Sequence, residues 1–263
     1  MAATVFTNLY SLDAQNNLAK NQAGLATAIQ RLSSGLRVNS SQDDAAGLAV
    51  ASVMDAQARG MTVAARNASD GISYSQTADS ALSSVTDMLQ RMRELATQAL
   101  NGAISDTDRG YINNEYSQLQ AESARVEGAA KINGTSVFGT FTFQIGANAT
   151  DTLAATFTST NITGTSVSTT GAASTALSSV DAWISSMASQ RSTIGGVQSR
   201  LTNTITYLQA AIENQTAARS RIMDADFAAE TANLTRGQIL QQAGTAMVAQ
   251  ANALPQSVLS LLK

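Results

Sequence analysis

The chain of 263 residues contains no cysteine and no histidine, and it has a single proline. Without cysteine there can be no disulfide and no thiolate nucleophile, and without histidine the commonest general base and imidazole ligand is missing. Aromatic residues make up 5% of the chain and charged residues 13%. This composition favours helices packed through small side chains over the bulky core of an enzyme. We therefore expect no enzymatic activity, no cofactor and no metal site.

The charge is low and of mixed sign. Sixteen basic residues oppose 19 acidic ones, which gives a net charge of −3, and the basic residues are scattered. A chain of this kind has no positive field that would attract nucleic acid. No window approaches the roughly 18 apolar residues of a membrane span, and the first residues lack the features of a cleaved signal. We expect no nucleic-acid partner, no membrane insertion, and either a cytoplasmic protein or export by a machinery that reads another signal.

Apolar residues recur at spacings of three and four along most of the chain, as in helices that pack against other helices. One such seam near the N-terminus contains Leu18, Leu25, Ile29 and Leu32. Ser34-Gly35 predicts the end of that helix, because glycine accepts the left-handed conformation there. Ser41 to Asp44 predicts a capping box for the next helix, which favours a structural over a catalytic role for the two aspartates.

The C-terminal segment has a comparable seam with a seven-residue period. Its members are Leu240, Met247, Leu254 and Leu261, with Val258 on the alternate position. Gly237 weakens this helix where a good helix former is expected. Pro255 predicts a kink or a local break. The two most amphipathic segments thus lie at opposite ends of the sequence.

The pattern changes between about residues 131 and 176. Phe141 to Ile145 and Leu153 to Phe157 alternate with period two on either side of Gly146 to Asp151, which predicts a β-hairpin. The Ser/Thr/Gly tract 158–174 has little to bury and is expected to be an exposed loop. The predicted fold class is mainly α: a long antiparallel helical bundle and a terminal coiled coil with a small central β-hairpin.

The two terminal seams favour polymerisation. Ordering each terminal residue costs conformational entropy, which must be offset by burial of the apolar seam. Two helices packed only against each other leave about half of their apolar surface exposed to water. Ordering of the terminal segments therefore becomes favourable only when neighbouring copies cover the remaining faces. If such contacts are head-to-tail and do not close, the product is an open helical filament.

Motifs at both ends of the chain resemble those of bacterial flagellins. In the N-terminal part they are Asn16 to Leu18, Ala28 to Arg37, Asp43 to Ala49, Arg66 to Ser73 and Leu89 to Leu95. In the C-terminal part they are Ala218 to Phe227, Glu230 to Thr235, Gln238 to Thr245 and Ala249 to Leu262. The resemblance covers roughly residues 4–146 and 177–263. It implies a structural subunit of the flagellar filament, exported unfolded through the flagellar type III apparatus into the extracellular flagellum.

The resemblance also implies a division of the chain into four segments. Residues 1–42 would form the N-terminal inner-tube helix and linker. Residues 43–176 would form the N-terminal outer-tube helices, the β-hairpin and a short exposed loop. Residues 177–224 would form the C-terminal outer-tube helix, and residues 225–263 the C-terminal inner-tube helix.

The partners implied by the resemblance are other copies of the chain, a flagellar export chaperone, the filament cap and the hook-junction proteins. A host Toll-like receptor that senses flagellin is a further implied partner. By this match Arg91, Leu95 and Glu115 would be its contacts. A role for the same residues as assembly contacts alone remains open.

Two alternatives stand beside this interpretation. A secreted binding module or membrane-active helical translocator could use amphipathic ends, but these stripes lack the cationic face and the Trp or Phe anchors of interfacial helices. A hook-junction protein is the nearer alternative, and it would cap a limited ring rather than elongate indefinitely.

Overall fold

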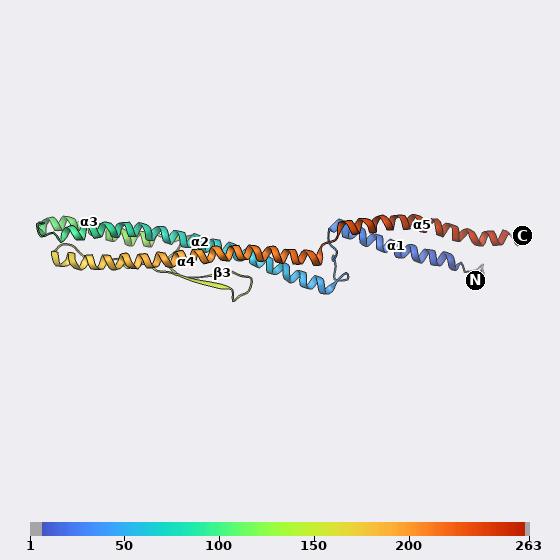
Figure 1. Ribbon diagram of the computed structural model, residues 1–263, viewed down its shortest axis with the longest axis horizontal. Helices are drawn as coiled ribbons and strands as arrows, with labels where there is room; N and C mark the ends of the chain where they lie inside the picture. Colours follow the sequence, from blue (N-terminus) through green and yellow to red (C-terminus); the bar gives the residue numbers. More distant parts are fainter. Residues whose placement is uncertain (1–6, 261–263) are drawn as a thin grey trace. The chain divides into compact units, whose positions relative to one another are not determined.

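The computed structural model describes the backbone of residues 7–260 and the side chains of residues 7–253. The described part is mainly helical, which confirms the predicted fold class (Figure 1). Its elements in chain order are α1 Leu9–Ser34, α2 Ala45–Ala99, α3 Asp106–Ala129, β1 Lys131–Ile132, β2 Thr135–Ser136, β3 Gly139–Gln144, β4 Thr152–Phe157, α4 Thr170–Met223 and α5 Phe227–Ser260.

The chain forms two compact units. One, here called the terminal unit, is made from both ends of the chain, up to Ala56 and from Gln215 onward. The other, the central unit, is continuous from Gln57 to Asn214. Both α2 and α4 contribute residues to each unit.

The central unit has a single apolar core between α2, α3, α4 and the strands. Its fully buried side chains include Leu82, Val85, Leu89, Met92, Tyr116, Phe157, Val180, Met187 and Leu201. On α2, Leu82, Val85, Leu89 and Met92 recur at spacings of three and four, and on α4, Val180, Met187 and Leu201 are separated by multiples of seven, as expected for faces that pack against other helices. The three-four rhythm in the sequence therefore identified the core of this unit.

The predicted central hairpin is present and lies on the helical core. Strands β3 and β4 pair antiparallel, with Gly139 opposite Phe157 and Gln144 opposite Thr152. Alternate residues of β4 are buried, as a half-buried strand requires. The ring of Tyr74 on α2 lies 5.1 Å from that of Phe141 on β3, measured between centroids. Aromatic contacts among Tyr74, Phe141, Phe143 and Phe157 thus join the hairpin to α2.

A second, smaller hairpin was not predicted. Strands β1 and β2 are joined by Asn133-Gly134, and both residues have positive φ, 49° and 79°. A two-residue turn with positive φ at both positions has the twist that antiparallel strands require, and Asn-Gly is its strongest sequence signal. That dipeptide could have located the turn.

The tract 158–174 differs from the predicted exposed loop. Helix α4 already begins at Thr170, and within the tract Ile162 and Val167 are buried. The Oδ1 atom of Asn113 on α3 accepts hydrogen bonds from the Val167 amide and the Ser166 hydroxyl, both at 2.9 Å. Burial of Ile162 and Val167 is enough to hold this segment, because neighbouring side chains form hydrogen bonds with its backbone amides. The expectation of full exposure was wrong.

Helix boundaries in the terminal unit follow the predicted signals with one change of residue. Gly35 is left-handed, with φ 70°, and its amide donates to Arg31 O at 2.8 Å, which confirms the predicted end of α1. The cap of α2 is Asp44 rather than Ser41, since Asp44 Oδ1 accepts from the Gly47 amide at 2.8 Å. The structural role of the aspartates is confirmed, although the capping residue differs.

The break between α4 and α5 is joined to the end of α1. Leu36 forms a β-bridge with Asp224, and the Arg37 amide donates to Met223 O at 2.6 Å. A guanidinium nitrogen of Arg37 donates to Ile222 O at 2.7 Å. Carbonyls at the end of a helix lack intrahelical partners, so the N-terminal segment supplies the cap for α4.

Candidate functional site

Helices α1 and α5 of the terminal unit lie side by side and antiparallel (Figure 1). The residues that face the partner helix are buried or half-buried and recur with heptad spacing. On α1 they are Ser11, Ala14, Leu18, Asn21, Leu25, Ala28 and Leu32, and on α5 they are Glu230, Leu234, Gly237, Gln241, Gly244, Val248 and Ala251. The predicted terminal coiled coil is thus present, but its inner seam is rich in small and polar residues.

Two leucines of α1 pack directly against glycines of α5. A Cβ atom at Gly237 would lie 3.1 Å from Leu25 Cδ1, and a Cβ atom at Gly244 would lie 3.0 Å from Leu18 Cδ1. These distances leave little room for a methyl group on α5. Gly237, which weakens the helix by propensity, therefore permits the close approach of the two helices.

Hydrogen bonds between side chains and backbone fix the register of this pair. Asn21 Nδ2 donates to Gly237 O at 2.9 Å, and Asn8 Nδ2 donates to Ala251 O at 2.7 Å. A shift of either helix along the other would separate these donors from their acceptors. The polar seam thus selects one alignment of the chain's two ends.

Large apolar side chains of the same helices point away from the seam. On α1 the exposed fractions of Leu12 and Ile29 are 48% and 51%, and on α5 those of Ile239, Leu240 and Met247 are 60%, 51% and 62%. We call these five residues the outward faces. Exposed apolar side chains in this number on one pair of helices indicate a site of association.

The predicted assembly residues therefore fall into two groups. Leu18, Leu25 and Leu32 are half-buried between the chain's own helices, whereas Ile29, Leu240 and Met247 lie on the outward faces. Leu254 and Val258 lie on α5, but their side chains are outside the described part of the structure. Leu261 is wholly outside the described residues. The α5 backbone continues as helix beyond Pro255 to Ser260, so the local break predicted there is absent.

The residues matched to receptor contacts lie on the central unit. Arg91 Nε donates to Glu115 Oε1 at 2.8 Å, and Arg91 NH1 donates to Glu94 Oε2 at 2.9 Å. Both hydrogen bonds raise the pKa of Arg91, and the bond to Glu115 has the larger effect. Leu95, by contrast, is 2% exposed and packs in the core. The structure thus brings Arg91 and Glu115 together on the surface and places Leu95 beneath it.

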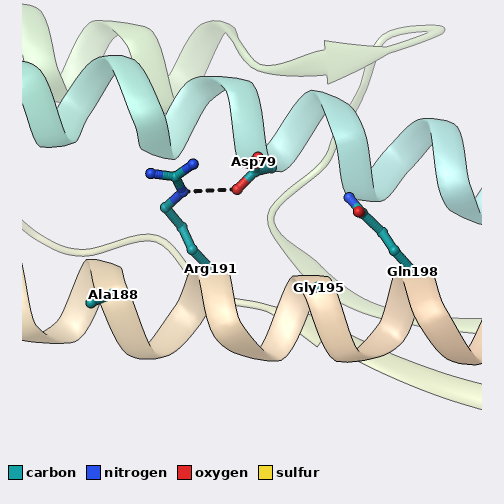
Figure 2. A pocket seen from close by; sticks show the side chains of 5 residues that line it. All are labelled: Asp79, Ala188, Arg191, Gly195 and Gln198. Carbon is teal, nitrogen blue, oxygen red and sulfur yellow. Dashed lines mark hydrogen bonds and ion pairs between the residues drawn. The ribbon is translucent and has the colours of Figure 1, made fainter.

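An open hollow of about 400 Å³ lies between α2 and α4 of the central unit (Figure 2). Asp79, Ala188, Arg191, Gly195 and Gln198 line it. Arg191 Nε donates to Asp79 Oδ1 at 2.9 Å, and this hydrogen bond raises the pKa of Arg191. The pair joins the two helices. None of the lining residues is a nucleophile placed next to a general base, as a catalytic site would require.

Two other kinds of site are absent from the described residues. Residues 7–253 contain no group of three or more His, Cys, Asp or Glu side chains that could hold a metal ion. Within the described part of the chain, none of the helices combines the length and apolar character needed to cross a membrane.

The fold and the outward faces define a helical structural protein of the kind that associates through its paired ends. The family model for the bacterial flagellin N-terminal helical region matches residues 5–142. The model for the bacterial flagellin C-terminal helical region matches residues 177–262. The chain belongs to the bacterial flagellin family.

Individual relatives agree with this assignment. Flagellin of Halalkalibacterium halodurans is 39% identical over 267 residues, covering 97% of this chain and 98% of the relative. The flagellar filament 33 kDa core protein of Treponema phagedenis is 39% identical over 281 residues, with the same coverage of each chain. The crystal structure of Bacillus cereus flagellin superposes with a TM-score of 0.51 at 30% identity, covering 54% of this chain and 88% of that one.

Family membership confirms the main expectations drawn from the sequence. Flagellins are structural proteins of the bacterial flagellar filament and are not enzymes. The chain is accordingly a structural filament subunit that polymerises with further flagellin subunits.

Proposed function

We propose that this flagellin polymerises by burying the outward faces of α1 and α5 against neighbouring copies. The observation that carries the proposal is the exposure of Ile29, Leu240 and Met247, each more than half exposed within one chain. Burying a side chain of this size contributes about 1.5–3 kcal/mol. The inner seam aligns the two ends, and the outward faces supply the contact between copies.

We further propose that residues 1–42 and 225–263 line the inner tube of the filament, with residues 43–176 and 177–224 outside them. The proposal is supported by the contrast between an exposed apolar terminal pair and a central unit with its own core. Residues at a filament's inner tube must contact several copies, which suits helices that are apolar on more than one face.

Export and transient partners follow from the same family role. The chain is secreted unfolded into the extracellular flagellum, and an export chaperone covers the apolar face of α5 before assembly. The filament cap and the hook-junction proteins meet the ends of the polymer. The hydrogen-bonded residues Arg91 and Glu115 form the polar part of a surface that a Toll-like receptor reads, while Leu95 supports that surface from the core.

Electron microscopy of seeded assembly tests the contact between copies. The double variant Leu240→Gln, Met247→Gln keeps helix-forming residues on α5 but removes two apolar side chains from its outward face. We expect it to form no long filaments while its central unit melts at the wild-type temperature. Gln118→Ala, an exposed change on α3, is the matched control and should assemble normally. Filaments of wild-type length from the double variant would refute the proposed contact.

A further inference from the structure

The chain contains two Asn-Gly dipeptides, and they lie in very different surroundings. Asn101-Gly102 forms the corner between α2 and α3, where both residues are exposed. Asn133-Gly134 forms the tight turn between β1 and β2. The side chain of an asparagine followed by glycine can react with the backbone. The glycine nitrogen attacks the side-chain amide, and glycine has no side chain of its own to hinder that attack.

The side chain of Asn101 is folded over the peptide bond that follows it. The Ala103 amide donates to Asn101 Oδ1 at 3.1 Å. This hydrogen bond closes a ring that contains both Asn101 Cγ and the Gly102 nitrogen, which limits rotation of the side chain away from that nitrogen. The Ala103 N–H also points at the oxygen on which negative charge would develop if Cγ were attacked.

The same peptide bond is polarised from its carbonyl side by a cation. A guanidinium nitrogen of Arg109 donates to Asn101 O at 3.0 Å, and the Ile104 amide donates to the same oxygen at 3.2 Å. Arg109 is 6% exposed and is fixed further by donation from Nε to Ala99 O at 2.8 Å. Asn101 O and the Gly102 nitrogen share one amide group, so donors at that oxygen stabilise the anion formed when the nitrogen loses its proton.

We propose that Asn101 is a site of spontaneous modification activated by the fold. The Gly102 nitrogen loses its proton and forms a bond to Asn101 Cγ. The bond from Cγ to Nδ2 then breaks, and ammonia leaves with the displaced proton. Water opens the resulting five-membered imide at either carbonyl, which gives aspartate or isoaspartate. No oxidant, reductant or cofactor is needed.

Asn133 supplies a control within the same molecule. Its φ is 49° and that of Gly134 is 79°, and the flanking pairs Lys131–Ser136 and Ile132–Thr135 hold the turn closed. Attack by the Gly134 nitrogen would require rotation of the turn and loss of those pairs. The fold therefore slows the reaction at Asn133 and speeds it at Asn101.

Modification would change the corner between α2 and α3 in two ways. Aspartate adds one negative charge next to the Arg109 guanidinium. Isoaspartate adds a methylene group to the backbone and displaces Asn101 O from its donors. Both products mark a subunit by its age, since the reaction needs only time and water.

Peptide mapping by mass spectrometry tests the proposal on the full chain. Wild-type protein is incubated at mildly alkaline pH, once folded and once in urea, and the aspartate and isoaspartate peptides are quantified over time. In the folded protein we expect Asn101 to react about tenfold faster than Asn133 and faster than Asn101 does in urea. In urea the two rates should converge.

Arg109→Lys keeps the charge but loses the fork that reaches two carbonyls. We expect it to slow Asn101 and to leave Asn133 unchanged, with circular dichroism confirming the fold. The proposal is overturned if folded Asn101 reacts no faster than in urea, or no faster than folded Asn133. Because that comparison uses wild-type protein, it holds even if the variant does not fold.

Discussion

The central and terminal units differ in how far their large apolar side chains are buried within one chain. Leu82, Leu89 and Met92 of the central unit are fully buried within one chain. Leu12, Ile239 and Met247 of the terminal unit are about half exposed or more, although they lie on helices that already have a partner. The first unit completes its core alone, whereas the second leaves large apolar side chains exposed, and we propose that other copies cover them. Stability of the chain and assembly of the filament therefore depend on different residues.

The largest expected effect comes from the central core. Leu89→Ala should lower the free energy of unfolding by about 2–5 kcal/mol, because it leaves a cavity in a fully packed site. Leu240→Ala removes a side chain of the same size from an exposed position and should change it by less than about 0.5 kcal/mol in the dispersed chain. Denaturant unfolding followed by circular dichroism, which reports on the helices of both units, measures both. Equal losses would remove the distinction between the units.

The inner seam of the terminal unit should respond to volume rather than to helix propensity. Gly237→Val places a branched side chain against Leu25 and should destabilise the α1–α5 pair by about 1–3 kcal/mol. At Gly24 an added Cβ meets no atom within 4 Å, so Gly24→Ala should stabilise α1 by about 0.5–1 kcal/mol. Thermal dissociation of filaments compares the two variants. A stabilising Gly237→Val would mean that the helices are not in close contact there.

A buried carboxyl should make the central unit sensitive to pH. Burial raises the pKa of Glu127, an effect that the hydrogen bond from the Thr160 amide offsets in part. The folded state therefore holds the proton more tightly than the unfolded state, and this stabilisation is present at low pH and lost as pH rises through the folded pKa. Glu127→Gln keeps the shape without the charge and should stabilise the unit by about 1 kcal/mol at pH 7.

Calorimetry at several pH values checks this prediction. The gap between Glu127→Gln and wild type should close as the pH falls through the folded pKa. Glu122→Gln is the control, because the hydrogen bond from Arg125 lowers the pKa of Glu122 and the opposite sign is expected. A gap that widens in acid would show that Glu127 does not carry a desolvation cost.

The smallest effect is expected from the ion pairs on the surface of the central unit. Arg93 Nε lies 2.7 Å from Asp181 Oδ1, and both side chains are about half exposed, at 53% and 49%. Such a pair contributes about 0.2–1 kcal/mol and weakens with salt. A double-mutant cycle of Arg93→Ala and Asp181→Ala at low and high salt measures the coupling. Coupling that salt leaves unchanged would indicate a pair shielded from solvent.

Much of the fold could be predicted from the sequence, because local rules and tertiary packing agree. Gly35 ends α1, Ser105 caps α3 through the Asp108 amide, and the alternation in Phe141 to Ile145 marks a strand. The Asn133-Gly134 dipeptide by itself indicates the turn between β1 and β2. The anchoring of tract 158–174 could not be foreseen, since the Val167 amide donates to Asn113 and the Thr165 hydroxyl is hydrogen-bonded to Tyr116, both far away in sequence.

The location of the apolar residues on the two terminal helices was predictable from the sequence, but the direction in which each one points was not. Heptad spacing identifies apolar residues on α1 and α5, yet it does not say which face meets the helix of the same chain. That choice follows from Gly237 and Gly244, which let the backbones approach and leave Leu240 and Met247 outside. On α5 the two glycines mark the face that meets Leu18 and Leu25 of α1, and Leu240 and Met247 lie on other sides of the helix.

Chemical protection of single cysteines tests the burial of the outward faces most directly. The chain has no native cysteine, so Ile29→Cys and Leu240→Cys each introduce a single reactive thiol. Both should react readily with a maleimide in dispersed subunits and become strongly protected after polymerisation. If both thiols react as fast in filaments as in dispersed subunits, neighbouring copies do not cover the outward faces, and the proposed mode of assembly is wrong.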